Sequence, residues 1–175
     1  DLELLAVDGA AARRCCAGTD VPEIVLRHAK VREWDAWSLL EDTELFGGLT
    51  VTQKNELETI LHPVNLRRGR ALVRAGAKAS DLFLVLSGTV EGSAPSGVAA
   101  GASVAGGATS REDGSSRGAV VGDAAALLAG RPQPRGASAT SAVRAFRIGR
   151  ADLAWFLDRN PGIKVRVQPW SADEA

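Results

Sequence analysis

The sequence predicts an α+β protein in which helices flank an antiparallel barrel or sandwich of short strands. Three observations support this fold class. Apolar residues recur at helical spacing before residue 62, as in the stripe of Leu57, Ile60 and Leu61. From Val64 onward, short apolar segments alternate with glycine turns at intervals of about 8–12 residues, which is typical of antiparallel β structure. A helical pattern then returns over 150–160.

Length and composition fit one domain of ordinary size. The chain has 175 residues, of which 45% are hydrophobic and 24% are charged, so it can bury a core. Its 21 Lys and Arg residues balance its 21 Asp and Glu residues, which gives a formal net charge of +0. Because nucleic-acid binding needs a basic surplus or a basic face, we expect no nucleic-acid partner. No apolar run reaches the roughly 18 residues of a membrane-spanning helix, so we expect no membrane span.

The cysteines and histidines indicate neither a disulfide framework nor a zinc site. Cys15 and Cys16 are adjacent, and His28 and His62 are the only histidines, so no spacing resembles a metal site. The chain opens without the basic segment of a secretory signal. We therefore expect an intracellular, reducing compartment.

Residues 1–42 are expected to form an N-terminal helical arm. A short helix fits 10–16, and a longer one fits 23–40. Trp34 and Trp37 lie three residues apart, so they would share one face of that helix and pack onto the domain.

A further helix should precede the first strand. Thr50 or Thr52 can cap it, and Pro63 should end it.

The β region should contain about eight short strands, as in a small antiparallel barrel. The sequence indicates strands at 64–66, 71–73, 82–86, 89–91 and 120–121, and an extended segment over 137–148. Residues 92–118 include 19 Gly, Ala or Ser among 27 residues, so we expect a flexible insertion over 92–117. A short helix should follow Gly122, and Pro161 should end the helix over 150–160, with no long helix after it.

No set of catalytic residues is visible. The chain lacks a Gly-x-Ser-x-Gly elbow and a His-Glu-x-x-His helix, so we expect no enzymatic activity in these residues. A basic run is interpreted as a solvated turn, with a nucleic-acid patch as the alternative. Its members are Arg67, Arg68, Arg70 and Arg74.

Short motifs follow one another in the order and at the spacing of a known family. They are Leu45-Phe46-x-x-Leu49, the turn glycines Gly69, Gly76 and Gly88, Gly118-x-x-x-Gly122-Asp123, Arg135-Gly136-Ala137, and Arg150-x-Asp152-Leu153-x-x-x-Leu157. On these motifs the chain resembles a cyclic nucleotide-binding domain over residues 43–161, apart from the insertion. The resemblance implies a jelly-roll-like antiparallel β-roll with flanking N-terminal helices, a short phosphate-binding helix and a C-terminal helix.

The resemblance also implies a ligand site for cAMP, or for cGMP. Its residues would be Gly122, Asp123, Ala124, Ala125, Arg135, Gly136 and Ala137. Backbone N–H groups at the start of the short helix and the Arg135 guanidinium would bind the phosphate. Alternatively, Arg135 is a solvated turn residue. No cofactor and no metal are implied.

Two positions depart from the pattern of that family. Asp123 stands where the family usually has Glu, and would accept a hydrogen bond from the ribose 2′-hydroxyl; alternatively its carboxylate only complements the start of the helix. Gly136 lacks the hydroxyl that favours cGMP in the family, so the resemblance implies cAMP in preference to cGMP.

Two functions are consistent with the sequence. In the first, the chain is a regulatory sensor of a cyclic nucleotide within a larger protein, and acts through its helical arm on an output domain or partner protein. In the second, it keeps the fold, binds no nucleotide and serves as a structural or docking module in a larger assembly. In both, the arm 1–42 precedes the domain 43–161 and the tail 162–175 follows it.

Overall fold

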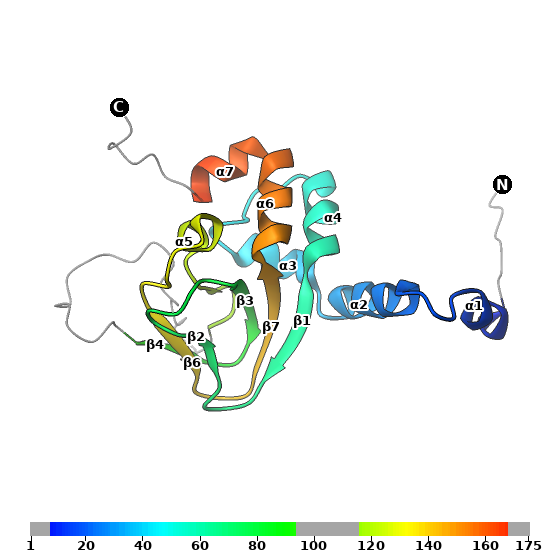
Figure 1. The fold of residues 1–175 in the computed structure, drawn as a ribbon, viewed down its shortest axis with the longest axis horizontal. Coiled ribbons are helices and arrows are strands. Elements are labelled where there is room, and N and C mark those ends of the chain that lie inside the picture. The colour runs from blue at the N-terminus through cyan, green and yellow to red at the C-terminus, as the bar shows by residue number, and fades with distance from the viewer. Residues whose placement is uncertain (1–7, 94–115, 168–175) are drawn as a thin grey trace.

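The computed structural model describes residues 8–93 and 116–167, which form two antiparallel sheets with helices packed beside them (Figure 1). The larger sheet has the strand order β1-β7-β3-β5 and the smaller has the order β2-β6-β4. The strands are β1 His62–Leu66, β2 Ala71–Val73, β3 Asp81–Ser87, β4 Val90–Ser93, β5 Val120–Val121, β6 Gly136–Ala139 and β7 Val143–Gly149. The predicted α+β class and antiparallel β-roll are confirmed, with seven strands in the described residues.

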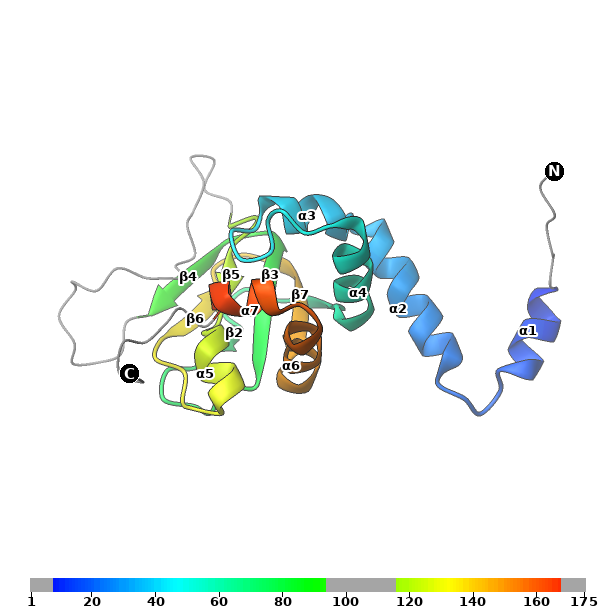
Figure 2. The ribbon, with the colours of Figure 1, turned by 90° about the horizontal axis from the view of Figure 1, so that it is seen from above.

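Seven helices accompany the sheets in the same part of the chain. They are α1 Gly9–Cys15, α2 Val21–Glu33, α3 Ala36–Asp42, α4 Val51–Ile60, α5 Ala124–Ala129, α6 Arg150–Arg159 and α7 Pro161–Val167. Figure 2 shows α1 and the first half of α2 projecting away from the sheets, whereas α3, α4 and α6 lie against them. None of the helices in 8–93 and 116–167 has the length and apolar character needed to cross a membrane.

The central strand β3 divides the apolar interior into two cores. Leu82, Leu84 and Leu86 point to the helices and join the core formed with α2–α7. Phe83 and Val85 point the other way and join the core between the two sheets. Because side chains alternate along a strand, one apolar strand can serve both cores, and all five residues are buried.

One prediction for the arm is wrong. The segment 23–40 forms two helices, because Asp35 has a left-handed backbone (φ 50°) between α2 and α3 and its carboxylate accepts the Ser38 N–H at 3.4 Å. Trp34 therefore ends α2 and packs on Phe146, with ring centroids 5.6 Å apart. Trp37 belongs to α3 and donates its indole N–H to Glu58 at 3.3 Å, so the two tryptophans do not share a helix face.

The C-terminal prediction holds for α6, but a short helix that the sequence did not indicate follows it. Helix α6 ends at Arg159 as expected, but Pro161 then occupies the first position of α7, where its missing N–H has no cost. Buried Asn160 makes this corner, since its side-chain N–H donates to the Phe156 carbonyl at 2.9 Å and its oxygen accepts from Gln53 of α4 at 2.9 Å. The predicted insertion lies mainly in 94–115, outside the described residues.

In the structure, Thr50 rather than Thr52 caps α4. The Thr50 hydroxyl accepts the Gln53 N–H at 3.3 Å, and the Gln53 side chain accepts the Thr50 N–H at 2.9 Å, which completes a capping box. We predict that Thr50→Ala lowers the free energy of unfolding by about 1 kcal/mol. Urea denaturation measures this loss. Thr52→Ala, at an exposed position inside the same helix, is the matched control and should leave stability unchanged.

His62 at the start of β1 should make stability depend on pH. Burial lowers its pKa from the ordinary value of 6.5, and the positive charges of Arg27 and Arg147 lower it further against the opposing effect of Asp152. Below pH 6.5 the unfolded chain therefore takes up a proton that the folded chain resists, so stability falls as the pH falls from 6.5 toward the lowered pKa. Thermal unfolding between pH 7.5 and 5 measures this loss. We predict a smaller loss in His62→Gln than in the parent, and an unchanged loss in the control His28→Gln.

Candidate functional site

The tight turn before α5 requires glycine at position 122. Gly122 has φ 111°, a conformation that side chains strongly disfavour. A Cβ atom there would lie 3.1 Å from the Asp81 carbonyl oxygen and 3.5 Å from the Gln133 side-chain nitrogen. The backbone can therefore pass closely over β3 and enter α5 only without a side chain.

Only some of the first backbone N–H groups of α5 make hydrogen bonds within the described residues. The Asp123 carboxylate accepts the Ala126 N–H through Oδ1 at 2.7 Å, and the Asp123 carbonyl accepts the Leu127 N–H at 2.9 Å. The N–H groups of Ala124 and Ala125 make no hydrogen bond within 8–93 and 116–167. Two adjacent donors therefore remain at the start of a helix, where an anion is stabilised.

Gln133 joins the two sequence motifs that predicted the site. Its side-chain oxygen accepts the Asp123 N–H at 3.0 Å, although Gln133 belongs to the segment just before Arg135. Gln133 is buried, and its backbone bonds to the turn before β3, where it accepts the Gly76 N–H at 2.8 Å and donates to the Ala77 carbonyl at 2.7 Å. This hydrogen bond brings the segment 133–136 beside the start of α5.

The second motif lies at the start of the middle strand of the smaller sheet. Gly136 and Ala137 open β6, which pairs with Ser93 and Gly92 of β4 on one side and with β2 on the other. Gly136 and Ala137 are buried, and Arg135 before them is half-buried. The structure thus places all seven predicted residues on two neighbouring segments, 122–125 and 135–137.

Gln133 was missed by the sequence reasoning. It lies between Pro132 and Pro134, and no motif or periodic pattern includes it. Only the folded chain shows that its amide oxygen holds the Asp123 N–H across ten residues of sequence.

The other end of α5 is joined to α6. Gly130 ends α5 in the left-handed conformation (φ 66°), and the Arg150 guanidinium donates to the Leu128 carbonyl at 2.8 Å. Arg150 is the first residue of α6. A displacement of α5 would therefore act directly on α6.

The site carries no metal-binding arrangement of its own. Among residues 8–93 and 116–167, no three His, Cys, Asp or Glu side chains are grouped so that they could hold a metal ion. The described parts of the site are the backbone N–H donors and the Asp123 carboxylate at the start of α5, with Arg135 on the neighbouring segment.

The fold is an antiparallel β-roll with flanking helices, which is the class that the sequence predicts. The family model for the cyclic nucleotide-binding domain matches residues 63–160, which is more than half of the chain. The chain therefore belongs to the cyclic nucleotide-binding domain family, whose members are regulatory modules. Curated protein sequences give no significant match.

Solved structures show the same fold at low sequence identity. The N-terminal domain of a transcriptional regulator from Streptomyces coelicolor A3(2) is 21% identical, with a TM-score of 0.53 over 74% of this chain and 84% of that chain. The regulatory subunit of a cAMP-independent protein kinase A from Trypanosoma cruzi, bound to guanosine, is 18% identical, with a TM-score of 0.59 over 88% of this chain and 49% of that chain. The regulatory domain of Toxoplasma gondii PKA, crystallised with cAMP, is 21% identical, with a TM-score of 0.52 over 68% of this chain and 42% of that chain.

The hydrogen bond of Gln133 yields a stability prediction. Gln133→Leu keeps the side-chain volume but leaves the Asp123 N–H without its acceptor, so we predict a loss of about 1–3 kcal/mol in the free energy of unfolding. Denaturation in urea measures the loss, and Asn55→Leu at an exposed position of α4 is the control for replacing an amide by leucine. An unchanged stability in Gln133→Leu would show that this bond does not hold the site together.

Proposed function

We propose that the chain is a regulatory module that senses a cyclic nucleotide, cAMP in preference to cGMP, within a larger protein. The observation that carries this proposal is the Gln133–Asp123 hydrogen bond, because it brings the Gly122-Asp123 turn and the Arg135-Gly136-Ala137 strand together. Membership of the family supports the ligand class.

The phosphate would bind at the start of α5. A cyclic phosphodiester carries one negative charge and two exposed oxygens. The N–H groups of Ala124 and Ala125 would donate to one side of it, and the Arg135 guanidinium, which can donate two parallel hydrogen bonds, would bind the other. The small side chains of both alanines let the phosphate approach the backbone.

The ribose would contact the carboxylate of Asp123. One carboxylate oxygen, Oδ1, already caps α5 by accepting the Ala126 N–H. The other, Oδ2, makes no hydrogen bond in the described part of the chain and can accept from the ribose 2′-hydroxyl. Gly136 offers no hydroxyl to a guanine base, which is the basis for preferring cAMP.

The signal would pass from α5 to α6. Ligand binding that shifts α5 would move the Leu128 carbonyl, which the Arg150 guanidinium holds at 2.8 Å. Asn160 at the end of α6 contacts Gln53 of α4, and Arg27 of α2 donates to the Thr59 carbonyl of α4 at 3.2 Å. These contacts connect the site with the helical arm, through which an output domain or partner protein could be regulated.

The second candidate function is a docking module that binds no nucleotide. One observation favours it: the Asp123 carboxylate serves as a helix cap, a structural role that needs no ligand. The T. cruzi kinase subunit is described as cAMP-independent and contains guanosine, so the fold also occurs where cAMP is not the regulator.

Replacing Arg135 separates the two functions. We predict that cAMP binds the parent chain with micromolar or tighter affinity in calorimetric titration, and binds more tightly than cGMP. Arg135→Ala should weaken cAMP binding by about 2–5 kcal/mol, because the phosphate would lose its charged partner. Arg131→Ala removes the same charge from an exposed position in the same loop and should leave the affinity unchanged.

Each other outcome has a definite meaning. Equal cAMP affinity in Arg135→Ala and the parent would show that the phosphate binds elsewhere. A folded parent that releases no heat with cAMP or cGMP would contradict the sensor and favour the docking module.

A further inference from the structure

A concave site lies outside the residues proposed to bind the cyclic nucleotide. A cavity of about 280 Å³ opens between β2, the turn that leads to β3, and the segment after α5. Its polar and charged lining residues are Arg70, Arg74, Lys78, Ser80, Asp81 and Gln133, and we call it the basic cavity. None of the seven residues proposed for the nucleotide site lines it.

Three cations of the basic cavity have no ion-pair partner among the residues that the structure describes. Arg70 and Arg74 flank β2, and Lys78 lies in the turn, where its backbone forms a bridge with Pro132. All three side chains are exposed, and none makes an ion pair or hydrogen bond within residues 8–93 and 116–167. Like charges held at one concave surface repel each other, so a bound anion would be stabilised there.

Asp81, the acidic residue among the described lining of the basic cavity, does not compensate these charges. The Asp81 carboxylate accepts the Ser80 hydroxyl at 2.6 Å through Oδ2, and faces the Arg147 guanidinium at 3.7 Å through Oδ1. Arg147 does not line the cavity, so a residue outside the cavity already compensates the negative charge of Asp81. The cavity itself therefore keeps a positive excess.

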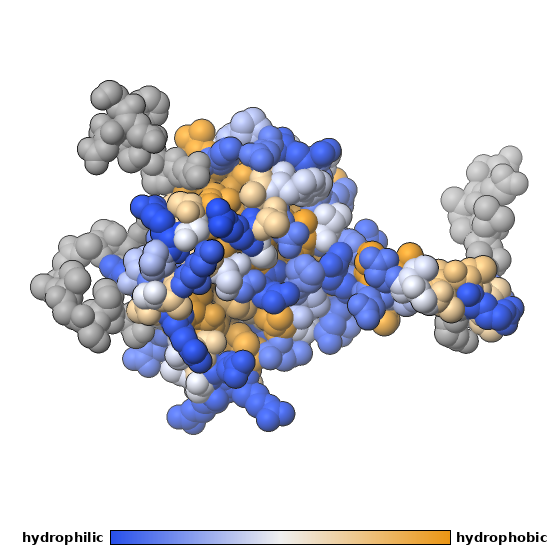
Figure 3. Space-filling model, viewed as in Figure 1, coloured by the Kyte–Doolittle hydropathy of each residue, from blue (hydrophilic) through white to orange (hydrophobic). Residues whose placement is uncertain are grey.

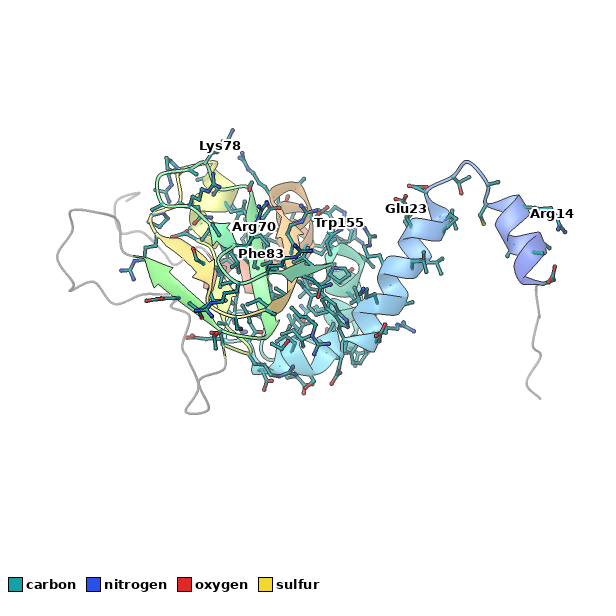
Figure 4. All side chains as sticks on the ribbon, turned by 90° about the horizontal axis from the view of Figure 1, so that it is seen from below. Arg14, Glu23, Arg70, Lys78, Phe83 and Trp155 are labelled. Atoms are coloured by element: carbon teal, nitrogen blue, oxygen red, sulfur yellow. The ribbon has the colours of Figure 1, made fainter. Side chains whose placement is uncertain are left out.

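The surrounding β-roll extends this excess. Residues 62–93 and 116–150 contain eleven Arg and Lys residues against three Asp and Glu residues, whereas residues 8–61 contain six against ten. The neutral total of the chain thus conceals a basic β-roll and an acidic helical region. Figure 4 shows Arg70 and Lys78 on the strand-containing part, remote from Arg14 and Glu23 of the arm, and Figure 3 shows hydrophilic side chains beside hydrophobic ones on the face that carries β2.

We propose that the basic cavity binds the di- or triphosphate group of a small phosphorylated molecule, such as a nucleoside triphosphate. Three cations match a group with several negative charges, and two of them are arginines, which bind phosphate oxygens in pairs. The cavity is near the lower size limit of small-molecule sites, about 300 Å³, so the phosphates would fill it and the remainder of the molecule would extend into solvent. A concave site of this size favours a small ligand over the extended backbone of a nucleic acid.

The test uses tripolyphosphate and ATP as probes of the whole 175-residue chain. Calorimetric titration at low ionic strength should show that both bind, and that Arg70→Ala and Arg74→Ala each weaken binding about 10-fold, as expected for the loss of one charge-assisted contact. Arg14→Ala removes the same charge from the arm and is the matched control. Circular dichroism and thermal unfolding establish that each variant is folded.

Arg135→Ala distinguishes this proposal from the proposed nucleotide site. The variant should keep its affinity for tripolyphosphate, whatever its affinity for cAMP, so the two proposals can fail separately. Loss of tripolyphosphate binding in Arg135→Ala, with normal binding in Arg70→Ala and Arg74→Ala, would show that polyphosphates enter the nucleotide site and would overturn the proposal.

Two further results would overturn it. The first is a parent chain that binds neither probe. The second is a single-stranded oligonucleotide that binds more tightly than tripolyphosphate and loses affinity equally in Arg67→Ala and Arg70→Ala. Because Arg67 does not line the cavity, this result would assign the basic surface to nucleic acid.

Discussion

The alternation of side chains along β3 is the constraint on which the rest of the structure depends. Leu82, Leu84 and Leu86 are buried against the helices, whereas Phe83 and Val85 are buried between the sheets. A shift of register by one residue would exchange these two sets, so the strand pairing is strongly specified. The start of β3 then becomes a fixed reference point: its first residue, Asp81, borders the basic cavity, and its carbonyl oxygen lies close to Gly122.

The geometry of the proposed ligand site depends on the buried amide of Gln133 as much as on the sheets. The Gln133 side chain accepts the Asp123 N–H, and its backbone bonds to Gly76 and Ala77. Three segments that are separate in sequence therefore meet at a residue that binds no ligand in the proposed site. This arrangement explains why Ala124 and Ala125, rather than Asp123, keep unused N–H groups at the start of α5.

Sequence alone predicted the features that depend on local patterns. Glycine turns and alternating apolar residues located the strands, and the candidate caps Thr50 and Thr52 marked the start of α4, because these signals act over a few residues. The break at Asp35 was missed, since no Gly or Pro marks it and the left-handed backbone of Asp35 is seen only in the folded chain. Gln133 was missed for the same reason: its partner lies in another segment, and only the fold brings them together.

Gln133 also connects the two proposed sites. It lines the basic cavity and holds the start of α5, so an anion that displaces the turn at Gly76 and Ala77 would alter the position of the Asp123 N–H. Coupling between two ligands is reciprocal in binding free energy. Any change that a bound polyphosphate makes in the affinity for the cyclic nucleotide would therefore be matched by an equal change that the cyclic nucleotide makes in the affinity for the polyphosphate. In the proposed mechanism the helical arm would receive this change through α6, because Arg150 holds the far end of the same short helix.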